Sequence, residues 1–170
     1  MKNISFRNDV LPLKNILYRL ALRITLNSAE AEDIVQDTLI KVWDKRDQWH
    51  EIESIEAFSL TICHNLALDR IKRMDNQNNS LDETNFEKAD LSSNPYEDTT
   101  HRDRMDLVRK IINGLPERQR SCMQLRDFEG KPYKEIAEIL SITEEQVKIN
   151  IFRARQSVKE KFQKIDNYGL

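Results

Sequence analysis

The sequence predicts an all-α protein, and three observations support that class. The 170 residues include only three glycines and four prolines, so the chain has few of the turn residues that a β fold needs. Charged residues make up 33% of the chain, which favours long, partly exposed helices. Apolar residues recur at spacings of three and four, as on one face of a helix; between residues 10 and 26 they are Leu13, Ile16, Leu17, Leu20 and Ile24.

A second helix is predicted to follow directly. Asn27, with Glu30 three residues later, has the spacing of an N-cap pair, and the helical pattern then continues to about Lys45. Its inner stripe is apolar. Its outer edge is polar and mainly acidic, and carries Asp33, Gln36, Asp37 and Lys41.

A third helix, capped by Ser54, is expected to run to about Met74. A polar loop that holds Trp49 and His50 precedes it. With the first two helices, it forms the predicted N-terminal domain, residues 1–74.

The segment 75–100 differs in composition from the rest of the chain. It has seven acidic residues against one basic residue, and almost no periodic apolar residues. Such a segment cannot bury enough apolar surface to offset the entropy lost on ordering. We therefore expect two small helical domains joined by a flexible acidic linker.

The predicted second domain, residues 101–170, consists of short helices. Pro116 and Pro132 suit the first turns of two of them. Thr143, with Gln146 three residues later, has the spacing of a capping box that begins the last helix.

Two short helices joined by about three residues, the second capped and cationic, form the helix-turn-helix that places a recognition helix in the major groove of DNA. From 144 to 164, six basic residues stand against three acidic ones, although the net charge of the chain is −2. Arg153 and Arg155 would favour phosphates. Residues nearer the start of the helix would reach base edges, namely Glu145, Gln146, Lys148, Ile149 and Asn150. The alternative is a basic, solvated surface helix.

No pattern in the sequence indicates a metal site, a cofactor or catalysis. Cys63 and Cys122 lie far apart without a C-x-x-C spacing, so we expect both to be small buried hydrophobic residues. No apolar run approaches the roughly 20 residues that cross a bilayer, and the run Met1-Lys2-Asn3-Ile4-Ser5 lacks the apolar core of a signal peptide. We expect a cytoplasmic protein that does not insert into the membrane, has no small-molecule substrate and is not an enzyme.

Three blocks of sequence, taken in order, resemble the extracytoplasmic-function (group IV) sigma factors of the sigma-70 family. The first is Ala31-Glu32-Asp33-Ile34-Val35-Gln36-Asp37-Thr38 with Val42-Trp43, similar to region 2. The second is Ile62-x-x-Asn65-Leu66-Ala67-x-Asp69 with Lys72-Arg73, similar to the helix that meets the −10 promoter element. The third is Leu115-Pro116 with Arg120, then Tyr133-Lys134-Glu135-Ile136-Ala137, and finally Val147-Lys148 with Arg153-Ala154-Arg155, similar to region 4, which reads the −35 element.

The resemblance implies a protein that binds core RNA polymerase, through its clamp helices and flap, and directs it to promoter DNA. Asp33, Gln36 and Asp37 fall where the family docks on the clamp helices, although they could also form a solvated helix edge. An anti-sigma factor is an expected further partner.

The resemblance also implies a set of contacts to the −10 element. Asn65, Asp69 and Arg73 share one face of the third helix and fit strand contact or a local Asp69–Arg73 pair. Trp49 and His50 lie in the loop that corresponds to the family's base-capturing loop, where an aromatic side chain could stack on a flipped base or pack back on its own domain. Trp43 is expected in the core.

This chain departs from the family pattern at several positions. Ser141 stands where glycine is common, and a left-handed residue there is strained by roughly 1 kcal/mol. Gln146, Ile149, Asn150 and Phe152 replace the usual residues of the recognition helix, so the upstream DNA sequence is not predicted.

Two other classes of protein carry a helix-turn-helix. A one-component or response-regulator transcription factor would need a ligand pocket or an α/β receiver in its N-terminal half, which here is short and helical. A small recombinase would need a nucleophile among clustered arginines, and neither Ser5, Ser28 nor Ser59 has that setting.

Overall fold

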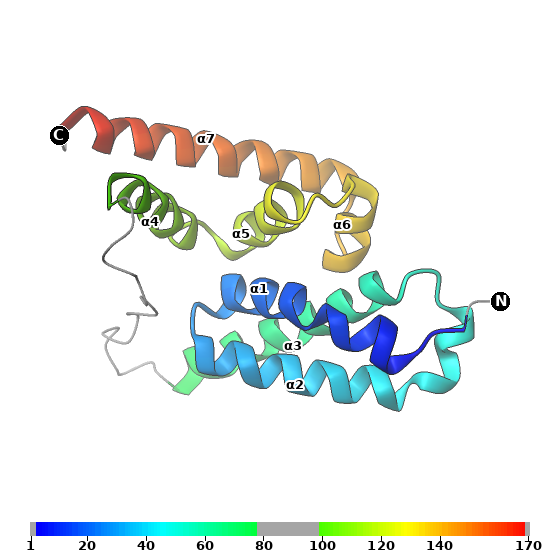
Figure 1. The fold of residues 1–170 in the computed structure, drawn as a ribbon. Coiled ribbons are helices and arrows are strands. Elements are labelled where there is room, and N and C mark those ends of the chain that lie inside the picture. Colours follow the sequence, from blue (N-terminus) through cyan, green and yellow to red (C-terminus); the bar gives the residue numbers. More distant parts are fainter. Residues whose placement is uncertain (1–2, 78–98, 169–170) are drawn as a thin grey trace.

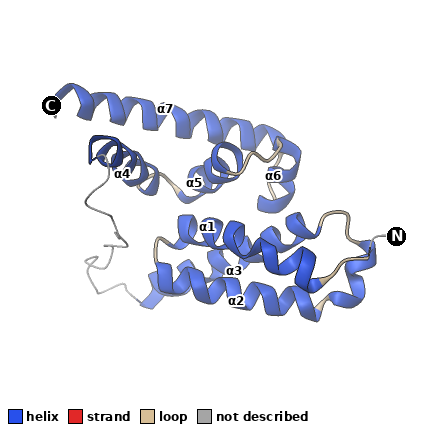
Figure 2. Cartoon of the chain, in the orientation of Figure 1, coloured by secondary structure: helices blue, strands red, loops and turns tan. Residues whose placement is uncertain are grey.

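The computed structural model describes residues 3–77 and 99–168, and Figure 1 shows them as two groups of helices packed against each other. Within these two ranges every regular element is helical, and no strand is present (Figure 2). The prediction of an all-α fold with two helical units is confirmed. The predicted linker, 75–100, lies almost entirely outside the described residues and stays a prediction.

The N-terminal unit, residues 3–77, is a bundle of three helices: α1 (Lys14–Thr25), α2 (Ser28–Asp44) and α3 (Ile55–Gln77). A π-helical turn (Phe6–Val10) and a 3-10 turn (Leu11–Leu13) precede α1. The predicted first helix therefore begins later than residue 10, because Pro12 has no backbone N–H to donate to the turn before it.

The predicted caps of α2 and α3 are present. The side-chain oxygen of Asn27 accepts a hydrogen bond from the Glu30 backbone N–H at 3.0 Å. The Ser54 hydroxyl accepts one from the Ala57 backbone N–H at 3.1 Å. Each bond satisfies a donor that the first turn of a helix leaves without a partner.

The C-terminal unit, residues 99–168, contains four helices: α4 (Thr99–Asn113), α5 (Glu117–Met123), α6 (Tyr133–Leu140) and α7 (Glu144–Tyr168). α5 continues into a π-helical segment, Gln124–Phe128. Ser141, in the turn between α6 and α7, has φ 58°, so it adopts the left-handed conformation expected at that position. Glycine reaches this conformation without strain, whereas serine does not.

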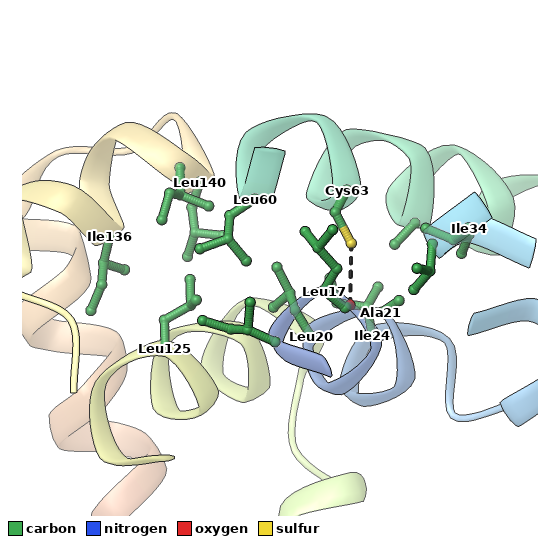
Figure 3. Packing of buried hydrophobic residues seen from close by; sticks show 14 of the residues in the cluster. Leu17, Leu20, Ala21, Ile24, Ile34, Leu60, Cys63, Leu125, Ile136 and Leu140 are labelled. Carbon is green, nitrogen blue, oxygen red and sulfur yellow. Dashed lines mark hydrogen bonds between the residues drawn. The ribbon is translucent and has the colours of Figure 1, made fainter. Parts of the chain in front are cut away.

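The two units share one hydrophobic core, seen from close by in Figure 3. Leu20 of α1 and Leu60 of α3 belong to the same buried cluster as Leu125, Ile136 and Leu140 of the C-terminal unit. All five are between 0 and 6% exposed. Contact between the units is therefore apolar at its centre, and burial of these side chains stabilises it.

Arg120 of α5 joins the units at the end of α1. Its guanidinium donates to the carbonyl oxygens of Arg23 and Ile24 at 2.8 and 2.9 Å, and to that of Leu115 at 2.7 Å. The last carbonyls of a helix lack partners within the helix, so Arg120 satisfies two of them from the other unit. Burial lowers the pKa of this guanidinium.

Further polar contacts surround the apolar centre. Arg19 of α1 makes two hydrogen bonds to the Glu129 carboxylate, at 2.7 and 2.8 Å. Burial acts to raise the pKa of Glu129, but the hydrogen bonds from Arg19 and Gln124 outweigh it and hold that pKa below its usual value. Lys131 contacts Glu56 of α3 at 2.5 Å. The boundary thus combines an apolar core with a polar rim.

Candidate docking and nucleic-acid surfaces

The outer edge of α2 carries the predicted docking residues. Asp33 and Gln36 are exposed, and Asp37 is half-exposed. Beside them lies a shallow groove of about 440 Å³, lined by Phe6, Gln36, Leu39, Ile40 and Trp43. An acidic edge next to an exposed apolar groove is the arrangement expected of a surface that binds another protein.

The prediction that Trp43 lies in the core is wrong, whereas Trp49 takes the second of its two expected places, packed back on its own domain. Trp43, expected in the core, is 44% exposed and lines this groove, where Ile40 is 56% exposed. Trp49 is only 8% exposed, and its indole N–H donates to the Val42 carbonyl at 3.0 Å. Its ring also meets that of Trp43 edge-on, with centroids 6.1 Å apart.

The segment around Trp49 forms a 3-10 helix, Arg46–Glu51, where a loop was expected. This turn folds the Trp49 ring back onto α2, so in this conformation the ring is not available to stack on a base. His50 remains exposed, with its Nε2 3.6 Å from the Glu51 carboxylate. Of the two predicted loop residues, only His50 faces outward.

Arg70 of α3 holds the acidic edge of α2, a role that the sequence analysis missed. Its guanidinium donates to Asp33 at 2.9 Å and to Glu30, and lies 3.5 Å from Asp37. The hydrogen bond to Glu30 is the main reason that the pKa of Arg70 is raised. Two of the three predicted docking residues are therefore oriented by one cation from the neighbouring helix.

The outer face of α3 presents the predicted −10 residues together. Asn65, Asp69 and Arg73 are all exposed and spaced by four residues along one helix. Both residues are described, and no ion pair joins Asp69 to Arg73, so the structure does not contain the local pair that was the alternative to strand contact. All three side chains are therefore accessible to solvent on one face of α3.

The capping box at the start of α7 is complete. The Thr143 hydroxyl accepts from the Gln146 backbone N–H, and the Gln146 side-chain oxygen accepts from the Thr143 backbone N–H, both at 3.0 Å. Asn150 donates to the Gln146 carbonyl at 2.8 Å. Two of the predicted base readers thus have side chains bonded to their own helix end.

Two other predicted DNA-binding residues are also engaged. The Lys148 ammonium lies 5.6 Å from the centre of the Tyr133 ring, within the range of a cation–π contact. Arg155 is bonded to Asp127, with Nε 3.1 Å from one carboxylate oxygen. The hydrogen bond to Asp127 raises the pKa of Arg155.

Glu145, Ile149 and Arg153 are exposed on α7. Phe152, which the sequence analysis did not place in the site, is more exposed than any of the other large apolar side chains described, at 67%. Phe152 was noted from the sequence only as a departure from the family pattern, because its exposure depends on packing that the sequence does not show. The start of α7 is therefore a surface with an apolar centre and charged edges.

Both cysteines are buried, as predicted, and neither is part of these surfaces. Burial raises the pKa of Cys63 and of Cys122 to about 12. The described residues contain no group of side chains that could hold a metal ion. None of the helices described is both long and apolar enough to cross a membrane.

A capped cationic helix after a short turn, carried on an all-α chain, defines a DNA-binding protein of the helix-turn-helix class. Comparison with known families narrows the class. Residues 10–77 match the Sigma-70 region 2 family, and residues 105–158 match the Sigma-70, region 4 family. The chain belongs to the sigma-70 family, in its extracytoplasmic-function group.

Individual relatives agree with this assignment. The chain is 26% identical over 160 residues to the probable RNA polymerase sigma factor RfaY of Xanthomonas campestris pv. campestris, covering 92% of this chain and 40% of the relative. It is 28% identical over 145 residues to the ECF RNA polymerase sigma factor SigE of Mycolicibacterium smegmatis, covering 85% of this chain and 56% of the relative. The chain thus spans about half the length of these two curated relatives.

A solved structure matches nearly the whole fold. It is the sigma factor RpoE in complex with the anti-sigma factor NepR from Bartonella quintana. The TM-score is 0.78 at 25% identity, covering 95% of this chain and 98% of that one.

Proposed function

We propose that this protein is a sigma factor that binds core RNA polymerase and directs it to start transcription at particular promoters. The observation that carries the proposal is the presence of both matched regions in one chain: region 2 on α1 to α3, and region 4 on the helix-turn-helix. A transcription factor that acts alone needs only the second. The protein works without catalysing a reaction, in the cytoplasm, where polymerase is.

The polymerase-docking surface is the outer edge of α2. Asp33, Gln36 and Asp37 supply the polar contacts, and the neighbouring groove formed with Ile40 and Trp43 supplies apolar area. Carboxylates suit a basic partner surface such as the clamp helices, because complementary charge raises the rate of encounter and fixes orientation. The flap is the second proposed contact on the polymerase.

Promoter DNA is bound at two places. Asn65, Asp69 and Arg73 on α3, with His50, meet the −10 element, and we leave Trp49 out because its ring is buried. The start of α7 meets the −35 element through the residues proposed from the sequence: Glu145, Gln146, Lys148, Ile149, Asn150, Arg153 and Arg155.

The chain is organised as two functional domains, 1–74 and 101–170, with a connecting linker at 75–100. The similar RpoE is a sigma factor in complex with the anti-sigma factor NepR. An anti-sigma factor is therefore a further proposed partner of this protein.

Reconstitution with core polymerase tests the proposal. The purified chain should bind core polymerase in the absence of DNA, and sequencing of DNA bound by the reconstituted enzyme should return a set of promoters with a shared motif. Core polymerase alone is the control. A chain that binds DNA but not core polymerase would instead be an independent transcription factor.

A further inference from the structure

Two large apolar side chains stand exposed close together in the first half of α7, the recognition helix. Ile149 is 44% exposed and Phe152 is 67% exposed. Three residues apart on α7, they share one face, with Cβ atoms about 5–6 Å apart. Charged residues flank them: Lys148 lies before and Arg153 after. Burying such side chains in a partner is favourable, so this pair is a candidate contact.

The polar residues around the pair are less available for reading bases. Gln146 is held in the capping box, and Asn150 is bonded to the carbonyl of Gln146. Arg155 is bonded to Asp127. The centre of the exposed surface is therefore formed by Ile149 and Phe152.

In the major groove, thymine is the one base that presents a methyl group, and apolar side chains recognise it by direct contact. Arg153 has no hydrogen-bond or ion-pair partner among the described residues, so it can hold the phosphate backbone beside them. The two Cβ atoms are separated by more than the 3.4 Å between successive bases along one strand, so the side chains reach bases one or two steps apart.

We propose that Ile149 and Phe152 read the 5-methyl groups of two thymines, one or two steps apart, in the upstream promoter element. The inference rests on the proposed function, since it needs α7 to enter the groove. It adds that sequence selection here depends on apolar contact with thymine more than on hydrogen bonds.

Replacing thymidine with deoxyuridine tests this, because the bases of the two nucleosides, thymine and uracil, differ only in the 5-methyl group. The upstream element is first identified by sequencing DNA bound to the reconstituted polymerase. Each thymine in it is then changed singly to deoxyuridine, and the affinity of the full-length protein in complex with core polymerase is measured. A methyl group in contact with an apolar side chain contributes enough that its loss should weaken binding about fourfold.

The expected result is this loss at two thymines for the unaltered chain. Phe152→Ala should remove the sensitivity to deoxyuridine at one of them and Ile149→Ala at the other. Both side chains are exposed, so neither change should disturb the fold, and circular dichroism would verify that. Glu160→Ala, exposed further along α7, is the matched control and should retain both sensitivities.

Three outcomes would overturn the inference about thymine but leave the proposed sigma-factor function intact. Promoters bound equally with thymine and deoxyuridine would show that the methyl groups are not read. Alanine variants that lose affinity without changing the sensitivity to deoxyuridine would point to a general contact. Variants that weaken only the binding of core polymerase would show that the apolar pair faces protein. If the reconstituted polymerase selects no promoter at all, the proposed function itself fails.

Discussion

Arg120→Met removes the side chain that joins α5 to the end of α1. Three carbonyl oxygens, those of Leu115, Arg23 and Ile24, accept from its guanidinium at 2.7 to 2.9 Å. Methionine keeps much of the length and the apolar contact but has no donor. At about 1 kcal/mol for each acceptor left without its partner, the free energy of unfolding should fall by about 3 kcal/mol. That is a large part of the roughly 5–15 kcal/mol that stabilises a typical protein.

Urea unfolding followed by two probes measures the effect. The two tryptophans, Trp43 and Trp49, both lie in the N-terminal unit, so their fluorescence reports that unit alone. Circular dichroism reports the helices of both units. In the unaltered chain the two curves should coincide, because the units share one core. In Arg120→Met the midpoint should fall and the curves should separate, because two of the three lost bonds cross the boundary.

Arg118→Met is the matched control, since Arg118 is exposed on the same helix. It should leave the midpoint close to that of the unaltered chain. Coincident curves at an unchanged midpoint for Arg120→Met would refute the reasoning. The apolar cluster alone would then hold the units together.

Three further predictions concern single residues. Asp37→Asn should weaken binding to core polymerase severalfold at low salt and less at high salt, because it removes one carboxylate charge, and a pull-down over a salt series measures this. Asparagine is chosen because it removes the charge without placing a cation beside Arg70. Burial lowers the pKa of His64 in the folded chain below its ordinary 6.5, and the charge of Glu117 only partly opposes this. The unfolded chain therefore binds more protons than the folded chain, so the free energy of unfolding should fall as the pH drops below about 6.5. His64→Gln should flatten that decline in a series of urea midpoints, and an unchanged pH dependence would contradict the assignment. Ser141→Gly should raise Tm by about 2–4 °C, since it relieves roughly 1 kcal/mol of left-handed strain; no rise in a thermal scan would show that the turn is unstrained.

Local signals in the sequence predicted local structure well. Asn27, Ser54 and Thr143 were recognised as caps because a cap depends on residues within one helical turn, and all three make the expected hydrogen bonds. The start of α1 was placed too early because Pro12 fits within an apolar periodicity that continues past it.

The sequence could not predict contacts between distant residues. Arg70 meets Glu30 across 40 residues, and Arg120 meets Ile24 across 96, with no periodicity to connect them. The place of Trp43 was mispredicted, and that of Trp49 was left open, for a related reason. Both are aromatic and close in sequence, and only the 3-10 turn that brings Trp49 back to Val42 decides which one completes the core.

The arginine cap on α1 has a consequence for how the chain is made. Arg120 leaves the ribosome long after Arg23 and Ile24, whose carbonyls accept its hydrogen bonds, because 97 and 96 residues of sequence separate them from it. At a synthesis rate of about 5–20 residues per second, these two carbonyl oxygens of α1 lack the Arg120 donor for roughly 5–20 s. Through that interval Leu20 and Leu60 lack the leucines and isoleucines of the C-terminal unit that later cover them. The nascent N-terminal unit therefore keeps an uncovered apolar face, open to misassociation, until the C-terminal unit has been synthesised.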